Sequence, residues 1–222
     1  MKKTFILSTL AVVTLLSLNS CNSSGTSGST TNDSTTVNKS ATTGKDAENL
    51  HTAMRKLWED HITWTRNVIC CLVDNLPGAD QAVKRLLKNQ DDIGDAIKPY
   101  YGDDAGKKLA ALLHDHITIS ADVVKSAKAN NKVALDSANK KWNDNADQIS
   151  AFLSTANPNW PLEDMKSMMH DHLKLTTDEA VARIKKDYDG DIAAYDKVHD
   201  EILKMADMLS DGIVKQYPDK FK

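Results

Sequence analysis

The fold is decided by a motif that occurs three times, as Trp58-Glu59-Asp60-His61, Leu113-His114-Asp115-His116 and Met169-His170-Asp171-His172. In each copy a bulky apolar residue and a polar residue precede Asp-His. The histidines are 55 and 56 residues apart. A hydroxyl residue stands four positions after each histidine: Thr65, Ser120 and Thr176. A period of about 55 residues with matched landmarks predicts a structural unit that is present three times.

Each unit has the pattern of a helical hairpin. Apolar residues recur at helical spacing, and glycine or proline falls between the periodic segments. No stretch alternates with a period of two, as a strand would. The sequence therefore predicts an all-α, up-and-down bundle of about six helices built from three repeated helical hairpins. The helices are expected at residues 46–76, 80–100, 103–129, 132–155, 161–186 and 190–217, with Leu76 and Ile192 among the inward-facing residues.

The amino terminus is typical of an export signal. Two lysines precede an apolar run from Phe5 to Leu18, which is shorter than the about 20 residues that span a bilayer. Leu18-Asn19-Ser20-Cys21 resembles the lipobox of bacterial lipoproteins. The resemblance implies a signal peptide at residues 1–20, cleavage before Cys21 and attachment of lipid there, with acyl chains such as palmitate. The alternative is an ordinary secretory signal with an incidental cysteine.

A tether and one domain follow the signal. Of the 23 residues from Asn22 to Gly44, 19 are Ser, Thr, Asn or Gly, so this segment cannot bury enough apolar surface to fold alone. We expect residues 21–45 to be a flexible tether and residues 46–222 to be the helical-bundle domain. Lipid on Cys21 would then attach the protein to a membrane of the bacterial cell envelope, outer or cytoplasmic, with the domain outside the cytoplasm.

Charge and cysteine content exclude some classes of partner and scaffold. Without Lys2 and Lys3 the chain has 26 basic and 31 acidic residues and no basic run, which argues against a nucleic acid partner. The membrane contact would rest on Cys21 alone. The other cysteines, Cys70 and Cys71, are adjacent in a helical pattern, so a disulfide framework is excluded. They are interpreted as packed residues, with a reactive or metal-binding pair as the alternative.

The three histidines are expected at one level of the bundle, because their helices run in the same direction. They occupy the apolar stripes of the first, third and fifth helices. The second helices of the units align at Asn89-Gln90-Asp91-Asp92-Ile93, Asn145-Ala146-Asp147-Gln148-Ile149 and Val198-His199-Asp200-Glu201-Ile202. The polar residues predicted to face the histidines are Gln90, Asn145 and His199.

Two interpretations of this layer stay open. In the structural one, each imidazole is a hydrogen-bonded polar spacer that fixes helix register. In the functional one, a metal such as zinc or copper, or a small ligand, is bound by His61, His116, His172 and His199. Copper is suggested by the methionines near His172, such as Met168 one turn away.

Helix arrangement distinguishes the two interpretations. Histidines on a common axis can share an ion, whereas equivalent residues in an open row of hairpins are at least about 8–10 Å apart. The first helix has a broad polar face that includes Arg55, Lys56 and Glu59. That face favours a position on the outside of the bundle rather than on a central axis, and with it the structural interpretation.

No pattern typical of an enzyme is present. The chain has no glycine-rich phosphate loop, no Gly-x-Ser-x-Gly and no His-Glu-x-x-His. The Glu-x-x-His pattern of di-iron bundles is absent at the repeated histidines, because Trp58, Leu113 and Met169 stand where it needs Glu. Asp187–Asp191 lacks the spacing of a calcium loop. We therefore expect a protein without catalytic residues.

From Leu57 onward the chain resembles a family of bacterial exported and lipoprotein-type helical proteins without an established activity. The resemblance rests on four stretches: WEDHITWTR at 58–66, NQDDIG at 89–94, ANPNWP at 156–161 and MADMLS at 205–210. It implies an envelope location and an all-helical fold, and it transfers no catalytic residue. The prediction is a lipid-anchored envelope bundle that acts as a binding or structural module; the alternative is a metal-binding protein that uses the histidines.

Overall fold

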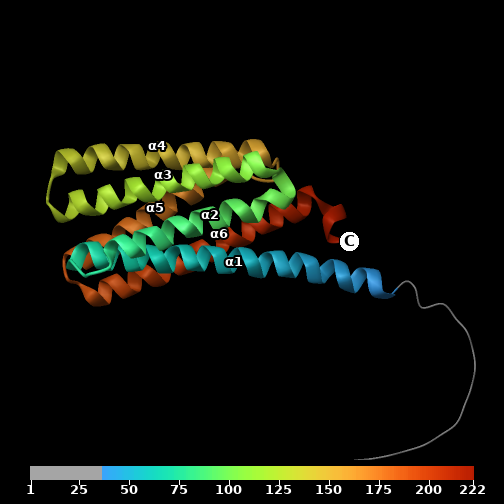
Figure 1. Cartoon of the computed structure of the whole chain (residues 1–222), viewed down its shortest axis with the longest axis horizontal. Helices are drawn as coiled ribbons and strands as arrows, with labels where there is room; N and C mark the ends of the chain where they lie inside the picture. The colour runs from blue at the N-terminus through green and yellow to red at the C-terminus, as the bar shows by residue number, and fades with distance from the viewer. Residues whose placement is uncertain (1–36) are drawn as a thin grey trace, which may run out of the picture. The chain divides into compact units, whose positions relative to one another are not determined.

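The computed structural model describes residues 37–222, with side chains from Gly44 onward. This part contains α1 (Val37–Asp74), α2 (Ala79–Tyr101), α3 (Asp103–Lys128), α4 (Lys132–Ala156), α5 (Leu162–Ile184), α6 (Tyr188–Gln216) and the 3-10 helix η1 (Pro218–Phe221) (Figure 1). No strand occurs within residues 37–222. The predicted signal peptide, Cys21 and residues 22–36 of the predicted tether lie outside the described residues.

The helices form a closed ring. Each helix contacts the next one along the chain, and α6 contacts α1. All six lie side by side along one long axis (Figure 1). In addition, α1, α3 and α5 contact one another across the middle of the ring. The predicted all-α, up-and-down bundle is confirmed. Its three hairpins form one closed ring rather than an open row.

The polar face of α1 does not keep this helix away from the centre, so the inference that placed it outside the bundle was wrong. Lys56 lies on the outer face with an exposed side chain, whereas Met54, Trp58 and His61 are at most 5% exposed. One apolar stripe of α1 is enough to reach α3 and α5, because an amphipathic helix buries one side and leaves the other to solvent.

The helices begin and end within two residues of the expected positions, except at the start of α1. α1 begins at Val37, so residues 37–45 are helical rather than part of the tether. Once a helix is nucleated, each further residue adds one hydrogen bond for one residue fixed, so a packed helix extends into a segment with little apolar content. Pro99 and Gly102 were expected to stop the second helix. α2 continues through Pro99 to Tyr101 and ends at Gly102, whose φ of 85° leaves the helical conformation.

Gly102 alone connects α2 to α3, and the two helices then pack closely. A Cβ atom added at Gly94 would lie 2.6 Å from the carbonyl oxygen of Gly106 and 2.8 Å from the Cβ of Ala110. These distances are too short for any side chain. Glycine at 94 and 106 is therefore what allows the backbones of this pair to meet.

Two residues predicted to face inward are exposed. Leu76 is 46% exposed because α1 ends at Asp74, and Leu76 lies in the turn that follows. Ile192 is 55% exposed, and its neighbour Asp191 is buried in its place. Asp191 points inward because it pairs with Arg66 and Arg183.

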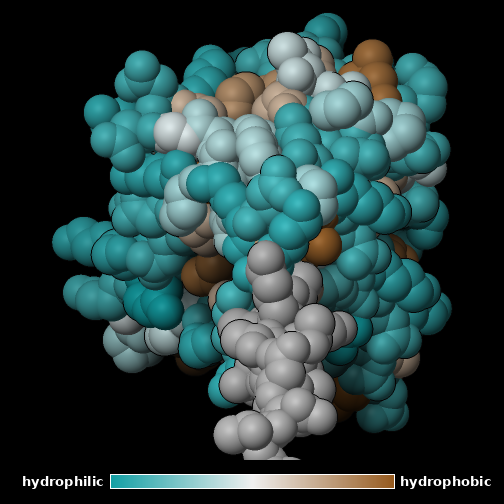
Figure 2. All heavy atoms as spheres, turned by 90° about the vertical axis from the view of Figure 1, so that its right-hand side faces the viewer, coloured by the Kyte–Doolittle hydropathy of each residue, from teal (hydrophilic) through white to brown (hydrophobic). Residues whose placement is uncertain are grey.

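The outer surface of the bundle is mainly hydrophilic. Figure 2 shows the end of the bundle that lies on the right in Figure 1, where hydrophobic side chains form only small patches. Among the helices of residues 37–222, none is long and apolar enough to cross a membrane.

Candidate functional site

Three histidines meet at the centre of the bundle. The ring of His172 lies 5.7 Å from that of His61 and 6.4 Å from that of His116, measured between centroids. All three residues are at most 3% exposed. The repeated motif thus places its imidazoles together on α1, α3 and α5. We call these three residues the histidine layer.

Each histidine of the layer is hydrogen-bonded through Nδ1 to the residue 29 positions later in the chain. Nε2 of Gln90 donates to His61 (3.2 Å), Oδ1 of Asn145 accepts from His116 (2.8 Å), and Oε2 of Glu201 accepts from His172 (2.9 Å). The prediction was correct for Gln90 and Asn145 and wrong for the third partner, which is Glu201 rather than His199. Sequence alignment on the isoleucines shifted the third unit by two residues, whereas the constant spacing of 29 would have identified Glu201.

His199 lies on the outside of the ring, where α6 meets α1. Its Nε2 is 3.0 Å from Oε1 of Glu59, the polar residue of the first motif. The polar residues of the other motifs form the same kind of contact with the preceding helix, His114 with Asp91 and His170 with Asp147, each at 3.0 Å. His199 therefore belongs to an outer set of contacts that joins neighbouring hairpins and not to the histidine layer.

Two histidines of the layer, His61 and His116, are held in a neutral state. Burial lowers the pKa of His61 well below its ordinary value, and the neighbouring His172 and His116 act in the same direction. Burial, together with His172, lowers the pKa of His116 to about 3. Nε1 of Trp142 donates to Nε2 of His116 (3.2 Å), so the proton of this neutral imidazole is on Nδ1. A protonated ring would carry its positive charge away from solvent, and this disfavours the charged form. Both pKa values are therefore lowered.

The predicted metal ligands are only partly brought together. His61, His116 and His172 converge, but His199 does not join them. No group of three or more His, Cys, Asp or Glu side chains in residues 44–222 is arranged to hold a metal ion. Nε2 of His116 already accepts a hydrogen bond from Nε1 of Trp142, and the gap beside the rings has a volume of only about 10 Å³. Of the methionines, Met169 and Met205 line this gap together with the three rings, whereas Met168 lines a groove at the surface.

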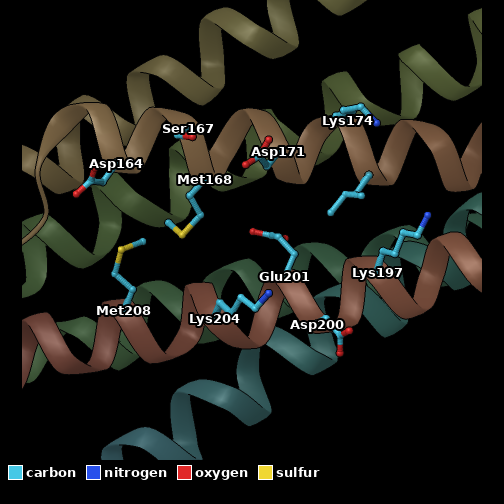
Figure 3. A pocket seen from close by; sticks show the side chains of 11 residues that line it. Asp164, Ser167, Met168, Asp171, Lys174, Lys197, Asp200, Glu201, Lys204 and Met208 are labelled. Carbon is cyan, nitrogen blue, oxygen red and sulfur yellow. The ribbon is translucent and has the colours of Figure 1, made fainter.

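Glu201 connects the histidine layer to the surface. It lies in a groove of about 680 Å³ between α5 and α6 (Figure 3). Oε1 of Glu201 is buried and has no hydrogen-bond partner among the described residues. We call this the α5–α6 groove; its lining residues are Asp164, Ser167, Met168, Asp171, Lys174, Leu175, Lys197, Asp200, Glu201, Lys204 and Met208.

A smaller groove of about 300 Å³ lies at the corresponding place between α3 and α4. Its seven lining residues are Asp115, Thr118, Ile119, Lys141, Asp144, Asn145 and Gln148. Each of them stands 56 positions before a residue of the α5–α6 groove. In the first hairpin the positions of Lys141 and Gln148 are taken by Leu86 and Ile93, which are each 1% exposed. The α5–α6 groove is therefore the most open and most highly charged version of a repeated feature.

A second buried polar cluster joins α1, α5 and α6. Arg66 pairs with Glu179 (2.7 Å) and with Asp191 (2.8 Å), and Arg183 pairs with Asp191 (3.1 Å) and with Asp74. Burial raises the pKa of Glu179 to about 7, although the Arg66 guanidinium acts in the opposite direction. Asp191, part of the stretch that superficially suggests a calcium loop, is used here as the partner of two arginines.

Cys70 and Cys71 are both free thiols. Burial raises the pKa of the Cys70 thiol, which makes it a poor nucleophile at neutral pH.

Comparison of the chain with family models, with curated proteins and with solved structures gives no match.

Proposed function

We propose that this protein is a lipid-anchored, non-catalytic binding module of the bacterial cell envelope, and that it binds a small zwitterion with an apolar tail in the α5–α6 groove. The anchor part of the proposal is supported by the lipobox-like sequence that ends at Cys21. The binding part is carried by one observation, the position and state of Glu201.

Glu201 is the one acidic residue among the three that bind the histidine layer. The equivalent positions hold amides, Gln90 and Asn145. One oxygen of Glu201 is used by His172, and the other is buried without a donor. A buried acceptor without a donor costs about 1–3 kcal/mol, and more when it is charged. A ligand ammonium group that enters the groove would supply the missing donor.

The rest of the groove selects the form of the ligand. Figure 3 shows Lys174 and Lys197 at one end, Met168 and Met208 toward the other, and Glu201 between them. Lys174 is paired with Asp178 (2.7 Å), which leaves Lys197 and Lys204, each one helical turn from Glu201, to receive an anionic group. The two methionines offer flexible apolar surface for a tail. An amino acid, or the end of a peptide, has this combination of groups.

A calorimetric titration of the purified, detergent-solubilised full chain tests the proposal with three compounds. L-leucine carries both charges and an apolar tail, isoamylamine carries only the ammonium, and 4-methylvalerate carries only the carboxylate. We expect saturable binding of L-leucine that is at least about tenfold tighter than binding of either analogue, because each lacks one charge-assisted contact.

Two variants locate the site. Glu201→Gln removes the carboxylate but keeps an acceptor for His172, as Gln is accommodated in the first hairpin. Lys197→Ala removes one of the two cations. Each should weaken L-leucine binding about tenfold or more. Lys141→Ala, at the equivalent position in the groove between α3 and α4, is the matched control and should leave binding unchanged. No saturable heat with any compound, or equal loss in the control, would refute the groove as the site.

The second candidate function is metal binding, which is favoured by the convergence of three imidazoles at 5.7 and 6.4 Å. It requires Nε2 of His116 to give up the hydrogen bond from Trp142. The contacts of the three Nδ1 atoms can stay, because a metal-bound imidazole commonly hydrogen-bonds through its other ring nitrogen. Metal analysis of the purified protein and of His61→Ala, His116→Ala and His172→Ala tests it. Stoichiometric zinc or copper that all three variants lose would support this function over the groove, and a metal-free protein would reject it.

A further inference from the structure

The bundle contains a partly enclosed chamber of about 80 Å³ one helical turn from the histidine layer. Its wall is contributed by α1 to α5, and it shares no residue with the α5–α6 groove. The hydroxyl residues that follow each motif all lie in this wall: Thr65, Ser120 and Thr176. The threefold repeat therefore places one small hydroxyl from each of α1, α3 and α5 around the same space.

Two of these hydroxyls have partners and one does not. Thr65 donates to the carbonyl oxygen of His61 and Ser120 to that of Ile117, both at 2.8 Å. Thr176 is 5% exposed, and its Oγ1 has no hydrogen-bond partner among the described residues. The remaining wall is mainly aliphatic, with side chains such as Val123 and Ala180. The chamber thus combines an apolar interior with a single unpartnered hydroxyl.

We propose that this chamber is an internal binding site for a small, mainly apolar molecule that carries one hydrogen-bonding oxygen, such as a short alcohol or ketone. An apolar cavity of about 150 Å³ binds benzene, so a chamber of about half that volume takes a ligand of about four non-hydrogen atoms. The ligand oxygen bonds to Thr176, and its carbon atoms fill the aliphatic part. The site goes beyond the proposed function, because neither the ligand class nor the lining residues are those of the groove.

Methyl NMR of the full chain in detergent, with labelled isoleucine and valine, tests the proposal. The probes are 2-propanol, which has a hydroxyl, and xenon, which has none. We expect saturable shifts of the methyl groups of Ile69, Val123 and Val181 with both probes. Thr176→Val keeps the volume of the side chain and removes its hydroxyl, so 2-propanol binding should weaken about two- to tenfold while xenon binding is kept.

A second test of the proposal uses larger side chains that fill the chamber. Ala180→Leu, or the smaller change Ala121→Val, should remove the shifts produced by both probes, whereas Glu201→Gln in the groove should leave them unchanged. The proposal is overturned if neither probe shifts the chamber methyl groups, which would mean that the chamber holds water only. It is also overturned if Thr176→Val leaves 2-propanol binding unchanged, since the hydroxyl would then have no part in recognition. Loss of L-leucine binding to the groove has no bearing on either outcome.

Discussion

Nδ1 of His172 lies 2.9 Å from Oε2 of Glu201, and this contact joins the buried histidine layer to a residue of the α5–α6 groove. The side chain of His172 is 4% exposed and that of Glu201 is 13% exposed. Removal of either partner would leave the other with an unpaired polar group in the interior. The contact therefore has a structural role that is separable from the ligand that we propose for the groove.

Glu201→Ala should destabilise the fold more than Glu201→Gln. The alanine leaves Nδ1 of His172 without an acceptor, at a cost of about 1–3 kcal/mol, whereas the glutamine retains one. Urea unfolding at pH 7 of the two variants and of the parent protein measures the difference. Equal destabilisation by both changes would show that the hydrogen bond contributes nothing beyond the packing of the side chain.

The histidine layer should make the fold sensitive to acid. The pKa of His116 is lowered to about 3 in the folded protein, whereas an unfolded histidine titrates near its ordinary 6.5. Below about pH 6.5 the unfolded chain therefore binds a proton that the folded protein does not. The contribution of His116 to the free energy of unfolding is complete above pH 6.5. As the pH decreases below 6.5, the free energy of unfolding decreases by about 1.4 kcal/mol per pH unit.

His116→Met removes this titrating group, so the slope of unfolding free energy against pH between 4.5 and 6.5 should decrease by about that amount. Asn145→Ala is the control, because it removes the hydrogen-bond partner of His116 but leaves the imidazole, and it should keep most of the slope. A slope that is unchanged in His116→Met would mean that this ring takes up its proton in the folded protein as well.

Glu179 should act in the opposite direction. Its pKa is raised to about 7 by burial, so the folded protein holds a proton that the unfolded chain has already released above about pH 4.5. Its contribution is complete below pH 4.5 and is lost as the pH rises through 7. The free energy of unfolding of the parent protein, relative to that of Glu179→Gln, should therefore fall by about 1.4 kcal/mol per pH unit between pH 5 and 7. A constant difference would place the pKa of Glu179 near its ordinary value, with Arg66 outweighing burial.

The period of about 55 residues was sufficient to predict three hairpins and a common level for His61, His116 and His172. Periodicity specifies which face of a helix is buried, and equivalent faces then meet if the units close into a ring. Periodicity could not specify that the three hairpins close into a ring, because the polar face of the first helix is equally compatible with an open row. The start of α1 at Val37 was also missed, because residue propensity does not describe extension from a packed helix.

The groove and the chamber were not predicted from the sequence. Both depend on side chains from different hairpins or helices whose relative height is set by packing. His199 was predicted in place of Glu201 because the second helices were aligned on Ile93, Ile149 and Ile202. The signal that could have found it is the spacing of 29, which Gln90 and Asn145 share with it.

Gly94→Ala should destabilise the protein strongly for a single methyl group. The new Cβ would lie 2.6 Å from the carbonyl oxygen of Gly106, so α2 and α3 would have to separate, at a cost of about 1–3 kcal/mol. Gly44→Ala is the matched control within α1, because nothing lies within 4 Å of its added Cβ. Alanine there should leave stability unchanged or raise it by up to about 1 kcal/mol. Thermal unfolding compares the two, and equal midpoints would contradict the close approach of α2 to α3.

Cys21→Ser should abolish lipid attachment. In the parent protein we expect labelled palmitate to be incorporated and the chain to sediment with the membrane fraction, because multiple acyl chains anchor far more firmly than one. The serine variant should incorporate no label. Its folded domain, checked by helical circular dichroism, should be unchanged. An ordinary secretory signal would instead leave the parent protein unlabelled and soluble, and a mature amino terminus at a residue other than Cys21 would contradict the anchor directly.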